Sequence, residues 1–182
     1  ISVNDNGSGI EFNDVPYAFL RHATSKIDKF DDIYNLFTFG FRGEALASLA
    51  SIGKIQCRSN TKNGSSQYII EGGKEISHSK LSAASSTGTT LSIKDLFYNT
   101  PARLKFIQST TSEKNRLTKI IKAFLLTSSQ IDFSVKWDQQ DKEIYPATDD
   151  LPERMRQVCK LKKDAKVFSF QEEYDSYELS IA

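Results

Sequence analysis

Four short segments with the alternating pattern of β-strands, separated by turn signals, constrain the fold of this chain more than any other feature. They cover about residues 54–59, 67–71, 74–80 and 89–95. Turns are expected at Asn63-Gly64 and Gly72-Gly73, because these residues tolerate the positive φ angles of tight hairpins. Since hairpins join neighbouring strands in antiparallel order, the sequence predicts an antiparallel meander.

Helical periodicity flanks this meander and predicts an α+β fold. A helix beginning near Gly43 carries small apolar side chains that permit close packing on a sheet. Beyond the meander, Thr110 and Glu113 have capping-box spacing at the start of a strongly periodic helix. Alternation then predicts a strand over 131–137 and a partner over 143–147, followed by one more helix and two closing strands.

A proline joint at Asn99-Thr100-Pro101 marks the expected boundary between two domains, because the residue before a proline is driven into extended backbone. We expect residues 1–107 and 108–182 to form these domains. Strand alternation reaches both ends of the chain, so we expect a piece truncated at both ends of a longer protein.

Composition excludes several classes of protein. With 38% hydrophobic and 26% charged residues among 182, the chain has the composition of an ordered soluble protein. The net charge of +1 is too small for bulk electrostatics to recruit DNA or an anionic membrane, so a polyanion must meet a local patch. The sequence contains no basic segment followed by an apolar core that could act as a signal peptide, and no apolar run near the roughly 20 residues of a membrane span, so an intracellular protein with no membrane partner is expected.

Cysteine and histidine are too sparse for a metal centre or a catalytic triad. Cys57 and Cys159 lie far apart and lack a C-x-x-C partner, as expected of reduced thiols. His22 and His78 have no histidine near them in the sequence, so each is expected to be a structural or surface residue.

A glycine turn follows the opening strand, with the sequence Asp5-Asn6-Gly7-Ser8-Gly9. Taken alone it is most often a tight turn. Its functional interpretation is that the Asp5 carboxylate accepts a hydrogen bond from a base amino group, while glycines without a Cβ let a flat ring approach the backbone. The complete P-loop and Rossmann glycine motifs are absent from the sequence.

Two later segments can each be interpreted either as a ligand-binding feature or as an ordinary structural one. The glycine turn over 40–46 lies at a helix N-terminus, where unpaired amides and the helix dipole can bind an anion, although it could equally be a flexible linker. The Gly88-Thr89-Thr90 segment offers hydroxyls to a polar ligand, although threonine is also simply a good strand residue.

Four motifs together resemble the MutL family of DNA mismatch repair proteins. They are D-N-G-S-G-I (5–10), R-H-A-T-S-K-I (21–27), G-F-R-G-E-A-L (40–46) and G-T-T-L-S-I-K-D-L-F-Y-N-T-P-A-R-L-K-F (88–106). The resemblance implies a two-layer α/β sandwich ATPase domain with a mixed, mostly antiparallel sheet. A ribosomal-protein-like β-α-β domain would follow it. G-F-R-G-E-A-L (40–46) and N-T-P-A-R (99–103) disfavour other ATPases of the same superfamily, such as a gyrase subunit.

The resemblance also implies the residues of an ATP site. Asp5 would bind the adenine amino group, Gly7 and Gly9 would flank the base, and Thr89 or Thr90 would support the aspartate. A lid over 23–41 would order on binding ATP, with Lys26 reaching the phosphates. The residues expected to wrap the triphosphate are Gly40, Phe41, Arg42, Gly43, Glu44, Ala45 and Leu46.

The cofactors implied are ATP and Mg²⁺. In the family, the catalytic glutamate and the magnesium-binding asparagine lie on a helix before the first motif, which would place them upstream of Ile1. We therefore expect no catalytic residue or metal ligand within this chain, and a chain that alone does not hydrolyse ATP efficiently, because a general base and the metal supply the main positioning groups of phosphoryl transfer.

DNA is the other implied partner. A basic stretch opposed by Glu113 alone could contact phosphates independently of sequence, although it could also be the solvated face of a helix. Its members are Arg103, Lys105, Lys114, Arg116, Lys119 and Lys122.

The expected function is that of a mismatch repair clamp. ATP binding and slow hydrolysis would order the lid and close a homo- or heterodimer on DNA, coupling a mismatch-recognition protein to a downstream nicking enzyme or helicase. The protein would be cytoplasmic in a bacterium and nuclear in a eukaryote. The alternative is a non-hydrolysing module that keeps the fold and binds DNA or a partner.

Overall fold

The computed structural model describes residues 1–27, 32, 34, 40, 42–82, 84–162, 164–167, 170–174 and 177–181, the last two ranges as backbone only. These residues fall into two compact units, unit 1 (Ile1–Ile107) and unit 2 (Gln108–Ala182). Among the described residues, no helix combines the length and the apolar character needed to cross a bilayer.

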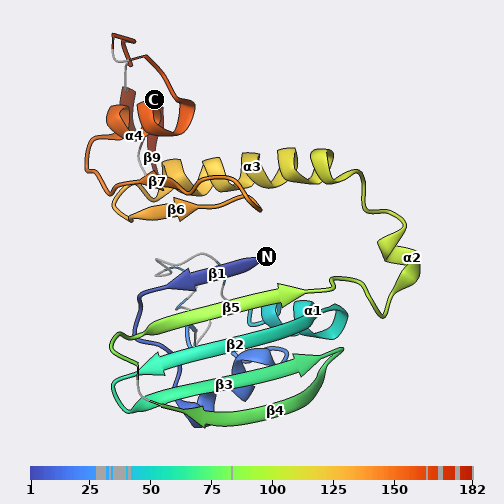
Figure 1. Cartoon of the computed structure of the whole chain (residues 1–182). Helices are drawn as coiled ribbons and strands as arrows, with labels where there is room; N and C mark the ends of the chain where they lie inside the picture. Colours follow the sequence, from blue (N-terminus) through green and yellow to red (C-terminus); the bar gives the residue numbers. More distant parts are fainter. Residues whose placement is uncertain are drawn as a thin grey trace. The chain divides into compact units, whose positions relative to one another are not determined.

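Unit 1 is built on a five-stranded sheet in the order β1-β5-β2-β3-β4 (Figure 1). Every neighbouring pair is antiparallel, which confirms the predicted fold class. The strands are β1 (Ser2–Asp5), β2 (Lys54–Thr61), β3 (Gly64–Glu71), β4 (Lys74–Leu81) and β5 (Gly88–Lys94).

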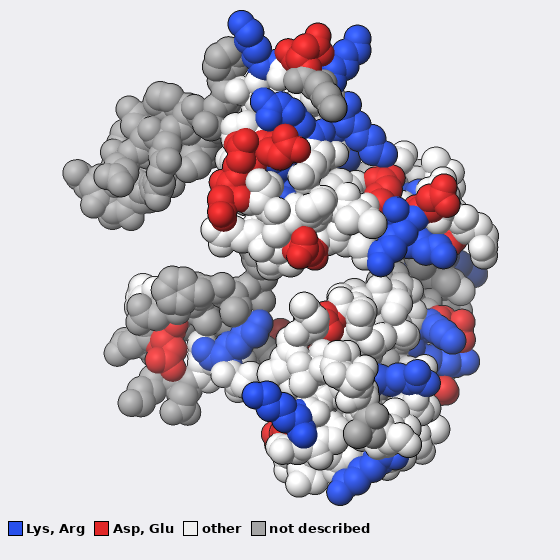
Figure 2. Space-filling model, turned by 60° about the vertical axis from the view of Figure 1, so that its left-hand side comes forward, with Lys and Arg blue, Asp and Glu red and all other residues white. Residues whose placement is uncertain are grey.

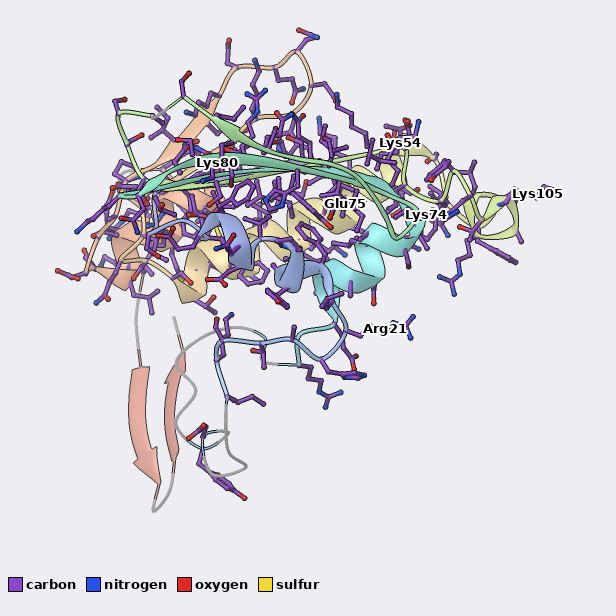
Figure 3. The ribbon with its side chains drawn as sticks, turned by 90° about the horizontal axis from the view of Figure 1, so that it is seen from below. Arg21, Lys54, Lys74, Glu75, Lys80 and Lys105 are labelled. Atoms are coloured by element: carbon purple, nitrogen blue, oxygen red, sulfur yellow. The ribbon has the colours of Figure 1, made fainter. Side chains whose placement is uncertain are left out.

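Short helices cover one face of this sheet, as the edge-on view of Figure 3 shows. They are the 3₁₀ helices η1 (Phe12–Asp14) and η2 (Pro16–Phe19) and the α-helix α1 (Ala45–Ile52). Alternate residues of β2 and β3 point toward them, including Ile55, Cys57 and Ile70, and form the core with Val15 and Phe19. Burying an aliphatic side chain of this size contributes about 1.5–3 kcal/mol, so the alternation itself fixes which face the helices cover.

One of the two predicted turns is confirmed and the other is displaced by one residue. Gly72 and Gly73, with φ of 54° and 80°, make the β3–β4 turn. In the β2–β3 hairpin, however, Thr61 pairs with Gly64, so the turn consists of residues 62–63. The Thr61 hydroxyl accounts for the shift, because it donates to the Gly64 carbonyl (3.2 Å) and accepts from the Asn63 amide (3.2 Å).

Helix α2 (Pro101–Leu104) lies near the end of unit 1, and unit 2 contains two longer helices with short strand pairs. The elements of unit 2 are α3 (Thr110–Thr127), β6 (Phe133–Val135), β7 (Glu143–Tyr145), α4 (Leu151–Cys159), β8 (Phe170–Tyr174) and β9 (Tyr177–Ile181). Its buried centre is Leu125, Tyr145 and Val158. The strands form two separate antiparallel pairs, β6–β7 and β8–β9, and the ribosomal-protein-like arrangement stays a prediction.

Two local predictions for unit 2 were wrong. The N-cap of α3 is Ser109 rather than Thr110: its hydroxyl accepts from the Ser112 amide (3.3 Å), and Glu113 accepts from the Gln108 amide (3.3 Å). Strand β6 has only three residues, because the Ile131 carbonyl accepts a hydrogen bond from the Arg154 side chain of α4 instead of from a neighbouring strand.

Candidate functional site

Asp5 ends β1 with its carboxylate held by the main chain. Its Oδ1 atom accepts two amide hydrogen bonds, from Gly7 (2.9 Å) and from Thr89 (3.1 Å). Asp5 is exposed, and among the described residues no hydrogen bond reaches its Oδ2 atom. The side chain is therefore fixed through one oxygen and offers the other as an acceptor.

The sheet register brings Asp5 onto the face that the helices cover. Asp5 pairs with Thr89, and Thr89 pairs with Ser59 of β2, so all three residues lie on one face. Cys57 lies one row further along β2, and burial raises the pKa of its thiol to about 11, with the nearby Asp5 charge as a second cause. The Asp5 carboxylate thus borders the buried core.

The other predicted glycine turn lies at the start of α1. Gly40 and Gly43 have φ of 78° and 60°. His22 donates its amide to the Gly43 carbonyl (3.2 Å), and its Nδ1 atom lies 3.5 Å from Glu44 Oε1. The turn is therefore joined to the segment that begins the expected lid.

The amides at the start of α1 are open to a ligand. The N-cap residue Glu44 makes no side-chain cap, and the first helical bond recorded there runs from the Ser48 amide to the Glu44 carbonyl (2.9 Å). Among the described residues, Ala45 and Leu46 have no partner for their amides, as is usual for a first turn. The helix dipole adds partial positive charge at the same point.

Both turns border the same core. Leu46 packs against the cluster that contains Cys57, and the Asp5 charge acts on that thiol. A hollow of about 240 Å³ lies elsewhere in unit 1, and neither Asp5 nor the 40–46 turn lines it. Its lining residues are Glu11, Phe12, Asn13, Thr61, Asn63, Gly64, Ser65, Ser66 and Lys80.

Of the remaining residues predicted to bind ATP, one contacts Asp5, others are exposed or bonded elsewhere, and some lie outside the described residues. Thr89 reaches Asp5 through its backbone amide, whereas the Thr90 hydroxyl donates to Asn4 Oδ1 (2.6 Å). Lys26 is exposed, and its amide donates to the Thr24 hydroxyl (3.1 Å). Arg42 is exposed, while Phe41 and most of the 28–39 stretch of the expected lid lie outside the described residues.

The six DNA candidates are divided between the units. Arg103 and Lys105 belong to unit 1, and the other four lie on α3 of unit 2. Arg116 forms an ion pair with Glu113 (3.2 Å), and Lys114 donates to Gln140 (3.2 Å) and lies over the Trp137 ring. On the face of unit 2 in Figure 2, basic and acidic residues are interspersed.

Sequence reasoning missed Ser59, which lies beside the Asp5 turn. Ser59 is buried within β2, and its hydroxyl forms hydrogen bonds with the backbone of Ile10, 49 positions earlier in the chain. The local pattern treats it as an ordinary inward-facing strand residue, so only the sheet register reveals the contact.

The contact between the 40–46 turn and residues 22–23 can be tested with Gly43→Ala. A Cβ at Gly43 would overlap the Ala23 backbone and would also meet the left-handed backbone penalty. We expect the unfolding free energy of unit 1 to fall by about 2–3 kcal/mol, measured by hydrogen exchange of the β2 and β3 amides. Gly40→Ala is the control: it has positive φ, but no described residue lies within 4 Å of a Cβ there, so a loss of only about 1 kcal/mol is expected. Equal losses would contradict this packing.

No family model matches the chain. Named relatives do: the DNA mismatch repair protein MutL of Elusimicrobium minutum is 46% identical over 139 residues, which cover 76% of this chain and 22% of the relative. The MutL protein of Dictyoglomus thermophilum is 38% identical over 180 residues, covering 97% and 31%. The chain spans about a fifth to a third of the length of the curated relatives it matches.

Solved structures agree in fold. The Aquifex aeolicus MutL ATPase domain complexed with ADP has a TM-score of 0.69 at 22% identity, covering 93% of this chain and 58% of that one. A crystal structure described as the N-terminal domain of a DNA repair protein has a TM-score of 0.63 at 27% identity, covering 86% and 46%.

The helix-covered antiparallel sheet and its agreement with these structures place the chain in the class of α+β domains to which MutL ATPase domains belong. The sequence identities go further than the fold. Since they reach 38% over nearly the whole chain, it belongs to the MutL family of DNA mismatch repair proteins.

Proposed function

We propose that unit 1 binds an adenine nucleotide, with Asp5 reading the base and the 40–46 turn holding the phosphates. The observation that carries this proposal is the Asp5 carboxylate, with one oxygen held by two amides and the other open. Adenine presents an exocyclic amino group, and a carboxylate oxygen is an acceptor that suits it. The Aquifex relative of similar fold was solved with ADP, which supports the same ligand class here.

In this proposal, backbone amides rather than side chains bind the phosphates of the nucleotide. The uncapped amides at the start of α1 and the positive φ of Gly40 and Gly43 suit a turn that wraps an anion. Because backbone amides carry this contact, it does not depend on a particular side chain. Lys26 and Arg42, which belong to the predicted ATP site, could add charge neutralisation at the phosphates.

In the full-length protein we propose that ATP binding and slow hydrolysis order the lid and close a dimer on DNA, coupling mismatch recognition to strand removal. Such a change is driven by the ligand's better contacts with the closed state. Among the described residues, no group of three His, Cys, Asp or Glu side chains could hold a metal ion. No step proposed here therefore passes through Mg²⁺.

Base recognition is tested by comparing ATP with inosine triphosphate, in which a carbonyl replaces the amino group. The carboxylate accepts from ATP but repels the inosine carbonyl oxygen, so calorimetry should give an affinity at least about tenfold higher for ATP. Equal affinities for the two nucleotides would remove the adenine assignment.

We also propose that α3 contacts DNA phosphates. Lys119 and Lys122 are exposed one turn apart on this helix. Reversing both charges to glutamate should weaken binding to duplex DNA and reduce the slope of log K against log salt by about 2, because each phosphate contact contributes about 0.9. Fluorescence anisotropy at several salt concentrations measures both quantities.

A charge-matched variant controls for the change in net charge. Lys62 and Lys74 are exposed on unit 1, so Lys62→Glu with Lys74→Glu alters net charge equally without touching α3. If the two double variants behave alike, α3 is an ordinary solvated helix face.

A further inference from the structure

A row of polar residues crosses the whole sheet of unit 1 on its helix-covered face. The register pairs Asp5 with Thr89, Thr89 with Ser59, Ser59 with Ser66 and Ser66 with Lys80. In Figure 3, Lys80 marks this end of the sheet, and Lys54 and Lys74 mark the other. Ser59 and Ser66 are only 1% and 3% exposed, so they are buried hydroxyls at one end of this face.

Ser59 differs from Ser66 in what its hydroxyl does. The Ser59 oxygen accepts from the Ile10 amide (2.5 Å) and donates to the Ile10 carbonyl (2.7 Å). A single side chain thereby satisfies both backbone groups of Ile10, as a neighbouring strand would. Among the described residues, Ser66 has no hydrogen bond from its hydroxyl.

Ile10 is the residue at which the Asp5 turn ends. Its side chain packs against the core cluster, and its backbone is held by Ser59. The preceding Gly9 has φ of 76°, and a Cβ there would overlap the Asn60 carbonyl. The turn is thus anchored at its first residue by Thr89 and Gly7, and at its last by the end of β2.

We propose that Ser59 is a positioning residue for base recognition: by fixing Ile10, its hydroxyl holds the glycine turn in the shape that aims the open oxygen of Asp5 at the ligand. This inference rests on the proposed nucleotide function. Ser59 lies beneath the turn and acts through Ile10, so it is not required to touch the nucleotide. A loosened turn would lose base discrimination while leaving the phosphate contacts of the 40–46 turn in place.

The test is the ratio of ATP affinity to inosine triphosphate affinity in Ser59→Ala. Without the hydroxyl, two backbone groups of Ile10 lose their partners, and the turn can leave its bound shape. We expect ATP affinity to fall about tenfold, with inosine triphosphate affinity almost unchanged, so that the ratio approaches one. If Ser59 supported only overall stability, both affinities would fall together and the ratio would survive, which would overturn the proposal.

Ser66→Ala is the matched control, since it removes a hydroxyl of similar burial from the same row, and its ratio should stay at the wild-type value. If Ser59→Ala does not fold, Ser59→Thr and Ser59→Val decide instead, because these nearly isosteric side chains differ in the hydroxyl. Thr is expected to keep the ratio and Val to lose it; equal ratios would overturn the proposal. Failure of the nucleotide function itself would appear separately, as a wild-type protein without any preference for ATP.

Discussion

Replacing Arg154 with alanine is expected to destabilise unit 2 by about 3–5 kcal/mol, because it leaves three backbone carbonyls without their donor and opens a cavity where a fully buried side chain stood. Arg154 is completely buried on α4. Its guanidinium donates to the carbonyls of Ser129, Ile131 (2.8 Å) and Tyr145 (3.3 Å). The Arg154 side chain therefore joins α4 to β7 and to the segment between α3 and β6. Among the described residues, no carboxylate forms an ion pair with Arg154.

Trp137 makes this prediction easy to measure. It is the only tryptophan of the chain and belongs to unit 2, so its fluorescence during urea unfolding reports on that unit. Arg156→Ala is the control, since Arg156 is on the same helix, partly exposed, and paired with Glu153 at 3.5 Å. Such a pair contributes about 0–1 kcal/mol. Similar losses in the two variants would contradict the role given to Arg154.

The second large effect is expected from Asp5→Asn, which should lower ATP affinity by about 10- to 100-fold. A hydrogen bond to a charged group contributes about 1.5–3 kcal/mol, and asparagine would also present an amide donor where adenine offers its own donor. Inosine triphosphate should bind the variant at least as tightly as the unaltered protein, because its carbonyl oxygen is no longer repelled and can accept from that new amide. Calorimetry with both nucleotides separates these effects.

Asp14→Asn provides the charge-matched control for this variant. Asp14 is exposed on η1 and loses the same charge without touching the glycine turn. Its ATP affinity should equal that of the unaltered protein. Loss of ATP affinity in both variants would indicate a general effect of charge and would withdraw Asp5 from base recognition.

The sequence predicts the elements of unit 1 well because their signals are local. Alternation along β2 and β3 and the paired Gly72 and Gly73 determine the meander without reference to distant residues. The small residues ahead of β2 likewise predict α1 close to its observed bounds.

Contacts between distant residues were not predictable in this way. Ser59 is an ordinary strand residue in the pattern, and only the three-dimensional register brings it to Ile10. Arg154 shares the helical spacing of Leu151, Met155 and Val158, but arginine is mostly an exposed residue type, so the sequence does not indicate its burial. It is buried because three carbonyls from other segments converge on it. The cap of α3 moved by one residue because Ser109 and Thr110 are both capable N-caps, and sequence spacing alone does not rank them.

The most direct test of the account follows amide resonances by NMR while adenosine, inorganic triphosphate and ATP are added separately to the isotope-labelled chain. If one nucleotide is held at both ends, adenosine should shift the amides of Gly7 and Thr89, triphosphate those of Gly43 and Ala45, and ATP both sets at the same concentration. If ATP shifts only one of these sets, or neither, the two turns do not belong to a single nucleotide site and the account is wrong.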